Sequence, residues 1–137
     1  MNLNDYREVF KKAKNIFSRF RPQVCPALNN KLIIFNSNGF NHLRYHVNGI
    51  PRPIREQISK MNLLPLVISV IKMANSVEDY RVRRSPIGSK RSNGVDNYKD
   101  IEYWSIVSSV GKRQIKVRVI IRKIGNGKLH FWSVMRT

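Results

Sequence analysis

Residues 101–135 read IEYWSIVSSVGKRQIKVRVIIRKIGNGKLHFWSVM, and this stretch decides the fold. It contains three runs rich in β-branched and aromatic residues, at 101–110, 114–124 and 128–135. Such residues favour strands, and short turns that contain Gly or Asn join neighbouring antiparallel strands. Turns of this kind separate the runs at residues 111–113 and 125–127. The stretch therefore predicts three antiparallel strands connected by two hairpin turns.

The sequence before this stretch is mostly helical in pattern. At the N-terminus, apolar residues recur at helical spacing and a proline ends the run: Tyr6, Phe10, Ala13, Phe17, Phe20 and then Pro22. We expect an N-terminal helix within residues 1–22, and a short strand with helical segments over 31–76. A sheet is expected over 77–135, with a mobile loop at 85–99 because that segment is rich in Gly, Ser and Asn.

These segments together predict an α+β fold, with N-terminal helices packed on a C-terminal antiparallel sheet of about four strands. The length of 137 residues suits a single domain over 1–137. The sequence shows no internal repeat.

The chain carries a large excess of positive charge. Its 26 Lys and Arg against 8 Asp and Glu give a net charge of +18. Nine basic residues and no acidic one lie between Val9 and Arg55, and eight basic residues and no acidic one lie between Tyr103 and Thr137. Charge that is unpaired over such spans favours a polyanionic partner, with a merely solvated surface as the plain alternative.

Several classes of protein are disfavoured by what the sequence contains. A single cysteine, Cys25, cannot form an internal disulfide and suits a reducing compartment. The most apolar run, Leu63–Met73, is too short to span a membrane and contains Pro65 and Lys72. No phosphate-binding Gly-rich loop, Cys/His zinc pattern or paired-carboxylate metal site is present. We expect a soluble cytoplasmic protein with no membrane partner, cofactor or metal.

One reaction suits a chain that is rich in cations and poor in carboxylates. In RNA cleavage by transesterification the 2′-hydroxyl of the substrate attacks its own phosphate, so that no metal is needed. Imidazole groups can transfer the protons near neutral pH, and Arg offers a planar fork of donors to the phosphate. DNA lacks the 2′-hydroxyl, which favours RNA as the partner.

The candidate residues for this chemistry occur in two blocks, of which the first is residues 41–46. On a helix, His42 and His46 lie one turn apart and can face the same way. The same spacing suits a zinc ion, but no partner carboxylate is near. A surface helix whose histidines only form hydrogen bonds is the remaining alternative.

The second block comprises residues 115–123 and 128–134. Alternation along a strand places Lys116, Arg118, Ile120 and Arg122 on one face, opposite the apolar Ile115, Val117, Val119 and Ile121. On the last strand, Leu129, Phe131 and Ser133 should share a face, as should His130, Trp132 and Val134. The pattern does not decide which of these sets joins Arg118, and a solvated sheet face would look the same.

Three motifs resemble the toxin nucleases of the barnase–EndoU–colicin–RelE superfamily. The segment from Arg118 to Val134, with its Gly-Asn-Gly turn, resembles the C-terminal signature of that superfamily. Residues 35–43 resemble the His-bearing segment of its phage and polymorphic-toxin branches, and residues 55–65 resemble a block in uncharacterised bacterial members. The resemblance covers roughly residues 31–134. It implies helices followed by a four-stranded antiparallel sheet, and RNA cleavage without a metal.

The resemblance also implies roles for individual residues. His42 would be the general base or acid, Arg118 would hold the phosphate with Arg122 beside it, and Ser133 would orient the phosphate. His130 is a second possible acid or base, so which histidine acts stays open. Six further residues are candidates for nucleic-acid binding: Arg44, His46, Arg52, Arg55, Lys116 and Lys128.

The leading hypothesis is a toxin-type, metal-independent endoribonuclease that is controlled by an acidic antitoxin or immunity protein. A non-catalytic RNA- or ribosome-binding protein, using the same cations with exposed aromatics such as Trp104 and Trp132, is the main alternative. A toxin of the same fold that acts on a protein is a third.

Overall fold

The computed structural model describes residues 3–86 and 98–137. The helices are α1 (Leu3–Ser18), α2 (Ser37–Arg44), α3 (Ile54–Leu63) and α4 (Val67–Met73), with short 3-10 helices at Pro26–Leu28 and Leu64–Leu66. The strands are β1 (Gln23–Cys25), β2 (Lys31–Ile33), β3 (Val77–Pro86), β4 (Tyr98–Val110), β5 (Ile115–Ile124) and β6 (His130–Arg136).

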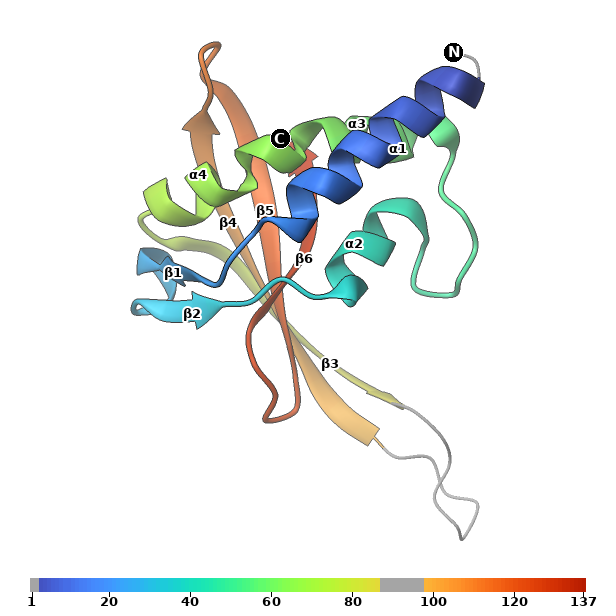
Figure 1. The fold of residues 1–137 in the computed structure, drawn as a ribbon. Coiled ribbons are helices and arrows are strands. Elements are labelled where there is room, and N and C mark those ends of the chain that lie inside the picture. The colour runs from blue at the N-terminus through green and yellow to red at the C-terminus, as the bar shows by residue number, and fades with distance from the viewer. Residues whose placement is uncertain (1–2, 87–97) are drawn as a thin grey trace, which may run out of the picture.

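The predicted α+β architecture is confirmed. Helices occupy the N-terminal half, and β3, β4, β5 and β6 form an antiparallel sheet in that spatial order (Figure 1). Strands β3 and β4 extend into the ends of the expected loop at 85–99, because Ser85 pairs with Lys99 and Pro86 with Tyr98. The rest of that predicted loop lies outside the described residues.

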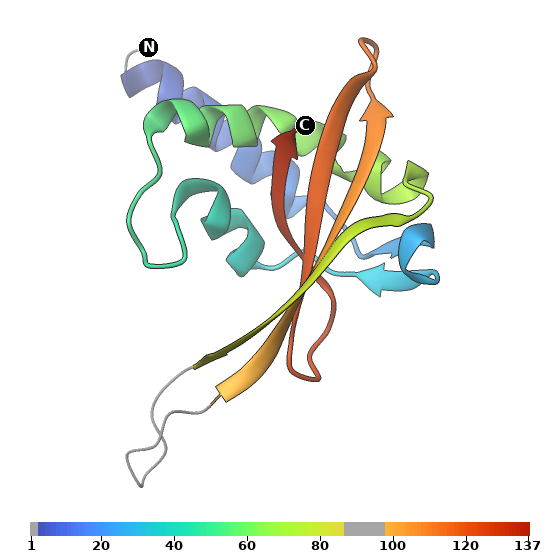
Figure 2. The ribbon, with the colours of Figure 1, turned by 180° about the vertical axis from the view of Figure 1, so that it is seen from behind.

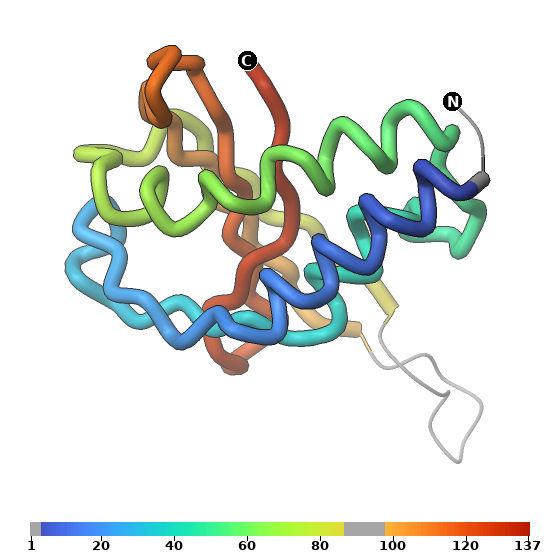
Figure 3. Tube along the Cα trace, turned by 45° about the horizontal axis from the view of Figure 1, so that its top comes forward, coloured from blue at the N-terminus to red at the C-terminus, as the bar shows by residue number. Residues whose placement is uncertain are grey.

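Helices cover one face of the sheet. Helix α1 lies alongside α3, and α4 packs on β4 and β5 (Figures 1 and 3). Seen from behind, the sheet presents a face that no helix of the described residues covers (Figure 2). The core lies between the two layers and includes fully buried Leu64, Val67, Val70 and Ile71 from the helical layer and Ile106, Val117, Val119 and Ile121 from the sheet. Within residues 3–86 and 98–137, none of the helices has the length and apolar character needed to cross a membrane.

An extra residue in β6 breaks the expected alternation of its side chains. Phe131 pairs with Ile121 and Ser133 pairs with Ile120, so that Trp132 is inserted between them as a β-bulge. As a result Phe131 and Val134 are both fully buried in the core, although strict alternation would place them on opposite faces. The prediction that Val134 shares a face with Trp132 is therefore wrong, and the bulge aims Trp132 away from the core.

Helix α2 packs directly on β6. Ile34, just before the helix, forms two backbone hydrogen bonds at the start of β6. Its N–H donates to Leu129 O and its carbonyl accepts from Phe131 N, at 3.0 Å each. The side chain of Asn36 then caps the helix by accepting a hydrogen bond from Asn38 N. Gly39 allows the close approach, since a Cβ at this position would lie 2.3 Å from Phe131 O. This contact fixes the position of α2 relative to β6.

Replacing Gly39 with alanine should therefore destabilise the protein. The added methyl group would push α2 off β6, and we expect a loss of about 2–3 kcal/mol, or roughly 6–15 °C in Tm. Thermal unfolding, monitored by circular dichroism, measures this loss of stability. Gly49→Ala is the matched control: it has φ +85 but nothing within 4 Å of an added Cβ, so only backbone strain of about 1 kcal/mol is expected. Equal losses in the two variants would contradict the packing argument.

Candidate functional site

The indole of Trp132 is the centre of a cluster of basic side chains. The imidazole of His42, from α2, stacks on it with ring centroids 3.8 Å apart and planes at 12°. Arg122 Cζ, from β5, lies 3.4 Å from the ring centroid. Both groups are too close to the ring to share one face, so the indole lies between the imidazole and the guanidinium. We call His42, Arg122 and Trp132 the Trp132 site.

Arg122 is held by a buried histidine of the neighbouring strand. Arg122 Nε donates to His130 Nε2 at 2.9 Å, and both side chains are almost fully buried. His130 Nε2 must therefore be unprotonated, which leaves the proton on Nδ1, 3.3 Å from Lys128 O. Burial, and then the charge of Arg122, lower the pKa of His130. In this arrangement His130 is a neutral acceptor that orients Arg122.

The imidazole of His42 is positioned by Arg52, which lies in the segment before α3. Arg52 Nη2 lies 3.0 Å from His42 Nε2, and Arg52 Nε donates to the His42 carbonyl at 2.8 Å. The same guanidinium pairs with Glu56 at 2.8 Å. Burial lowers the pKa of His42 to about 4, and the positive charges of Arg52, Lys60 and Arg122 add to the effect. His42 is thus a neutral imidazole at physiological pH.

Lys60 is a buried cation on the inner side of the site. Its ammonium donates to Ser133 Oγ and to the Val134 carbonyl, each at 3.2 Å. Burial is the main cause that lowers the pKa of Lys60, and the neighbouring Arg52 acts in the same direction. Because Ser133 is only 2% exposed, it holds Lys60 in place and does not face the solvent.

The outer side of the site opens into a shallow hollow of about 250 Å³. His42 and Arg122 both line it, so an imidazole and a guanidinium border the same solvent-open space. Its other lining residues are Asn38, Asn41, Tyr45, His46, Val47 and Trp132. His46 therefore supplies a second imidazole to this hollow.

Three of the five expected catalytic residues, Arg118, His130 and Ser133, do not line this hollow. Arg118 pairs with Glu78 of β3 at 3.1 Å, and it precedes Arg122 by four residues on the same face of β5. At ~3.3 Å per residue, the two Cα atoms are about 13 Å apart. Ser133 is buried against Lys60. The structure thus brings His42, Arg122 and His130 together, and it does not place Arg118 among them.

The residues expected to bind nucleic acid are scattered. His46 lines the hollow and Arg52 holds His42, as described above. Arg44 is occupied within the fold, since its Nε donates to Tyr6 Oη and its Cζ lies 4.3 Å from the Phe10 ring centroid. The remaining three, Arg55, Lys116 and Lys128, are exposed.

Two important residues of the site were not identified from the sequence in these roles. Arg52 was expected only to bind nucleic acid, and Lys60 was not a candidate at all. Glu56 and Lys60 have the i,i+4 spacing of an exposed helical ion pair, but Glu56 pairs with Arg52 instead and Lys60 is buried. Only the packing of α3 against β6 reveals these roles.

Stability should depend on pH through His42. Above about pH 6.5 the imidazole is neutral in both the folded and the unfolded chain, so it has no effect there. Between pH 6.5 and 4 the unfolded chain takes up a proton that the folded protein does not, and stability falls as the pH is lowered. Between pH 7 and 4.5, the free energy of unfolding should fall by about 1–3 kcal/mol less in His42→Gln than in the parent, as measured by urea unfolding. Parallel pH profiles for the two proteins would refute this.

No three His, Cys, Asp or Glu side chains in the described ranges gather into a set that could hold a metal ion. In comparisons with known proteins, no protein-family model, curated protein or solved structure matches the chain.

Proposed function

We propose that the protein is a metal-independent endoribonuclease that cleaves RNA by attack of the 2′-hydroxyl on the adjacent phosphate. The observation that carries the proposal is the geometry of the Trp132 site. A neutral imidazole and a buried arginine lie on either side of one indole and line the same open hollow. This pairing supplies a base and a phosphate-binding cation together, which is what the reaction requires.

In the proposed reaction Arg122 binds the non-bridging oxygens of the scissile phosphate. His42 Nε2 takes the proton of the 2′-hydroxyl after RNA binding displaces its hydrogen bond from Arg52 Nη2, while a bond forms between the 2′-oxygen and phosphorus. The bond from phosphorus to the 5′-oxygen breaks, and His46, which also lines the hollow, supplies a proton to the leaving oxygen. The products are a 2′,3′-cyclic phosphate and a free 5′-hydroxyl. The bound phosphate raises the pKa of His42 towards neutrality, since a nearby anion favours the imidazolium.

A protein with a net charge of +18 and this activity would endanger the cell that makes it. An acidic antitoxin or immunity protein fits this charge and would bind rapidly through electrostatic attraction.

Induced expression in a bacterial host tests the function. We expect growth arrest, and RNA fragments with cyclic-phosphate ends, for the parent but not for His42→Gln. Growth arrest with intact RNA would instead favour an action on a protein.

Binding of RNA should depend strongly on salt whether or not cleavage occurs. A cation that neutralises phosphates releases counterions, so affinity for a single-stranded oligonucleotide should fall about tenfold or more between about 50 and 150 mM salt. Fluorescence anisotropy with a 2′-O-methyl oligonucleotide, which cannot be cleaved by this route, measures it. Salt-independent binding would remove the electrostatic basis of both the nuclease and the non-catalytic RNA-binding hypotheses.

A further inference from the structure

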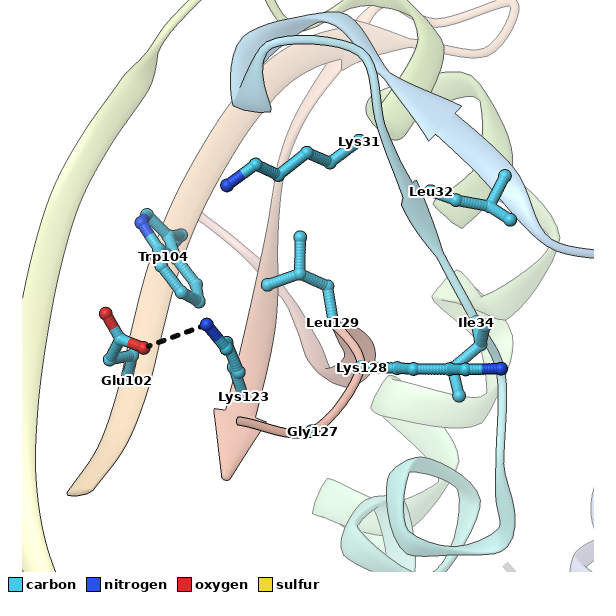
Figure 4. A pocket seen from close by; sticks show the side chains of 9 residues that line it. All are labelled: Lys31, Leu32, Ile34, Glu102, Trp104, Lys123, Gly127, Lys128 and Leu129. Carbon is cyan, nitrogen blue, oxygen red and sulfur yellow. Dashed lines mark ion pairs between the residues drawn. The ribbon is translucent and has the colours of Figure 1, made fainter. Parts of the chain in front are cut away.

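A second basic hollow lies between β2 and the sheet, and no residue of the Trp132 site lines it. It measures about 440 Å³. Figure 4 shows Trp104 projecting into it from β4, between the ends of Lys31 and Lys123, with Leu129 beside them. Its remaining lining residues are Leu32, Ile34, Glu102, Gly127 and Lys128. We call it the Trp104 hollow.

The Trp104 hollow and the Trp132 site lie on opposite faces of the sheet. Trp104 pairs directly with Ile121, so the two side chains share a face, and Ile121 is buried beneath the helices. Arg122, the next residue of β5, points to the other face. Tyr80 adds a second aromatic ring next to Trp104, at 5.4 Å between centroids, and is 48% exposed.

The charge of the hollow is positive. Lys123 makes only a long ion pair of 3.9 Å with Glu102, and Glu102 also accepts a hydrogen bond of 2.6 Å from Tyr80 Oη. Across the described part of the chain, Lys31 and Lys128 have no acidic side chain within ion-pair distance. The hollow therefore offers the uncompensated ammonium of Lys31 and the weakly paired ammonium of Lys123 beside Trp104, whereas the ammonium of Lys128 points away from it (Figure 4).

This combination matches a nucleotide. A base has a flat π-face that can stack on an indole, and its phosphate can contact ammonium groups nearby. The lining cations are all lysines, which bind phosphate as point charges, whereas planar carboxylates are best matched by the fork of an arginine. A peptide that carries only acidic side chains, such as polyglutamate, would leave the indole unused.

We propose that the Trp104 hollow binds one nucleotide of single-stranded RNA outside the cleavage site, with its base on Trp104 and its phosphates at Lys31 and Lys123. The proposal rests on RNA being the substrate of the Trp132 site. Lys123 directly follows Arg122, and Lys128 lies two residues before His130, so the turn between β5 and β6 connects the two sites. An RNA strand that crosses this turn can occupy both, which makes RNA of several nucleotides the preferred substrate.

The direct test uses a protein in which Trp104 is the only tryptophan. The chain has two, so Trp132→Phe provides it. Titration with a single-stranded 2′-O-methyl oligonucleotide should quench the fluorescence of Trp104, and polyglutamate at equal charge should not. If this variant does not fold, the indole N–H resonance of Trp104 in the parent protein gives the same readout by NMR. Quenching by polyglutamate alone, or RNA binding that leaves Trp104 unchanged, would overturn the proposal.

A matched pair of double variants separates the hollow from general charge effects. Lys31→Gln with Lys123→Gln, which removes both proposed phosphate contacts, should weaken binding of the oligonucleotide about five- to tenfold. Lys11→Gln with Lys14→Gln, which removes the same charge from α1, should weaken it less than about threefold. Equal losses would overturn the proposal. Binding is measured with an RNA that cannot be cleaved, so the two proposals can fail separately. Quenching of Trp104 fluorescence without any nuclease activity would refute only the proposed function. Cleavage of RNA without any change in Trp104 fluorescence would refute only this inference.

Discussion

Replacing His42 with alanine is expected to lower the rate of RNA cleavage by about two to three orders of magnitude. His42 lines the open hollow, and its low pKa keeps it unprotonated and able to accept the 2′-hydroxyl proton. The loss of one positioned general base typically costs a factor of this size. Affinity for RNA should change less than about threefold, because a neutral side chain contributes no charge to phosphate binding. Single-turnover cleavage and anisotropy measure the two quantities.

His42→Gln is the companion variant. Its amide oxygen can still accept the hydrogen bond from Arg52, so the local structure should be kept while proton transfer is lost. We expect the same fall in rate as for alanine, with Tm closer to that of the parent. Cleavage at the parental rate by His42→Gln would show that His42 is not the base.

Arg122 and Arg118 form a natural comparison, since they lie on one face of the same strand. We expect Arg122→Ala to lower cleavage by about two to three orders of magnitude, as is usual when one donor to the transition state is removed. Arg118→Ala should lower it less than about threefold, because Arg118 pairs with Glu78 and does not line the hollow. Cleavage rates of both variants, with Tm as a check on folding, provide the measurement.

Arg122→Lys sharpens this comparison. It keeps the positive charge but loses the planar fork and the hydrogen bond to His130. A rate close to that of Arg122→Ala would indicate that the geometry of the guanidinium matters. If Arg118→Ala were the more damaging change, the phosphate would bind at the centre of the sheet, as the resemblance to toxin nucleases implies, and the Trp132 site would be the wrong location.

The sheet could be predicted from the sequence because its strands and turns are local features. The runs at 101–110, 114–124 and 128–135 correspond closely to β4, β5 and β6. The bulge at Trp132 could not be predicted, since it depends on how β6 pairs with β5 and packs on the core. A single inserted residue changes which side chains of β6 face the core, and it directs Trp132 to the site.

The site itself was predicted only in part. His42, Arg122 and His130 were candidates because imidazole and guanidinium suit the chemistry, and the structure gathers them. Their arrangement depends on contacts between residues far apart in the sequence, such as His42 with Trp132 and Lys60 with Ser133. Periodicity carries no information about such contacts. For the same reason, Arg118 and Arg122 could not be distinguished on one strand face.

Whether the protein cleaves RNA through the 2′-hydroxyl and without a metal is decided by incubating it, in the presence of a metal chelator, with an RNA and with the same sequence carrying 2′-O-methyl groups. We expect that only the unmodified RNA is cut, that its 5′ fragments end in a 2′,3′-cyclic phosphate, and that both molecules bind with similar affinity. Cleavage of the methylated RNA at a similar rate, or tight binding of the unmodified RNA with no cleavage at all, would contradict this expectation.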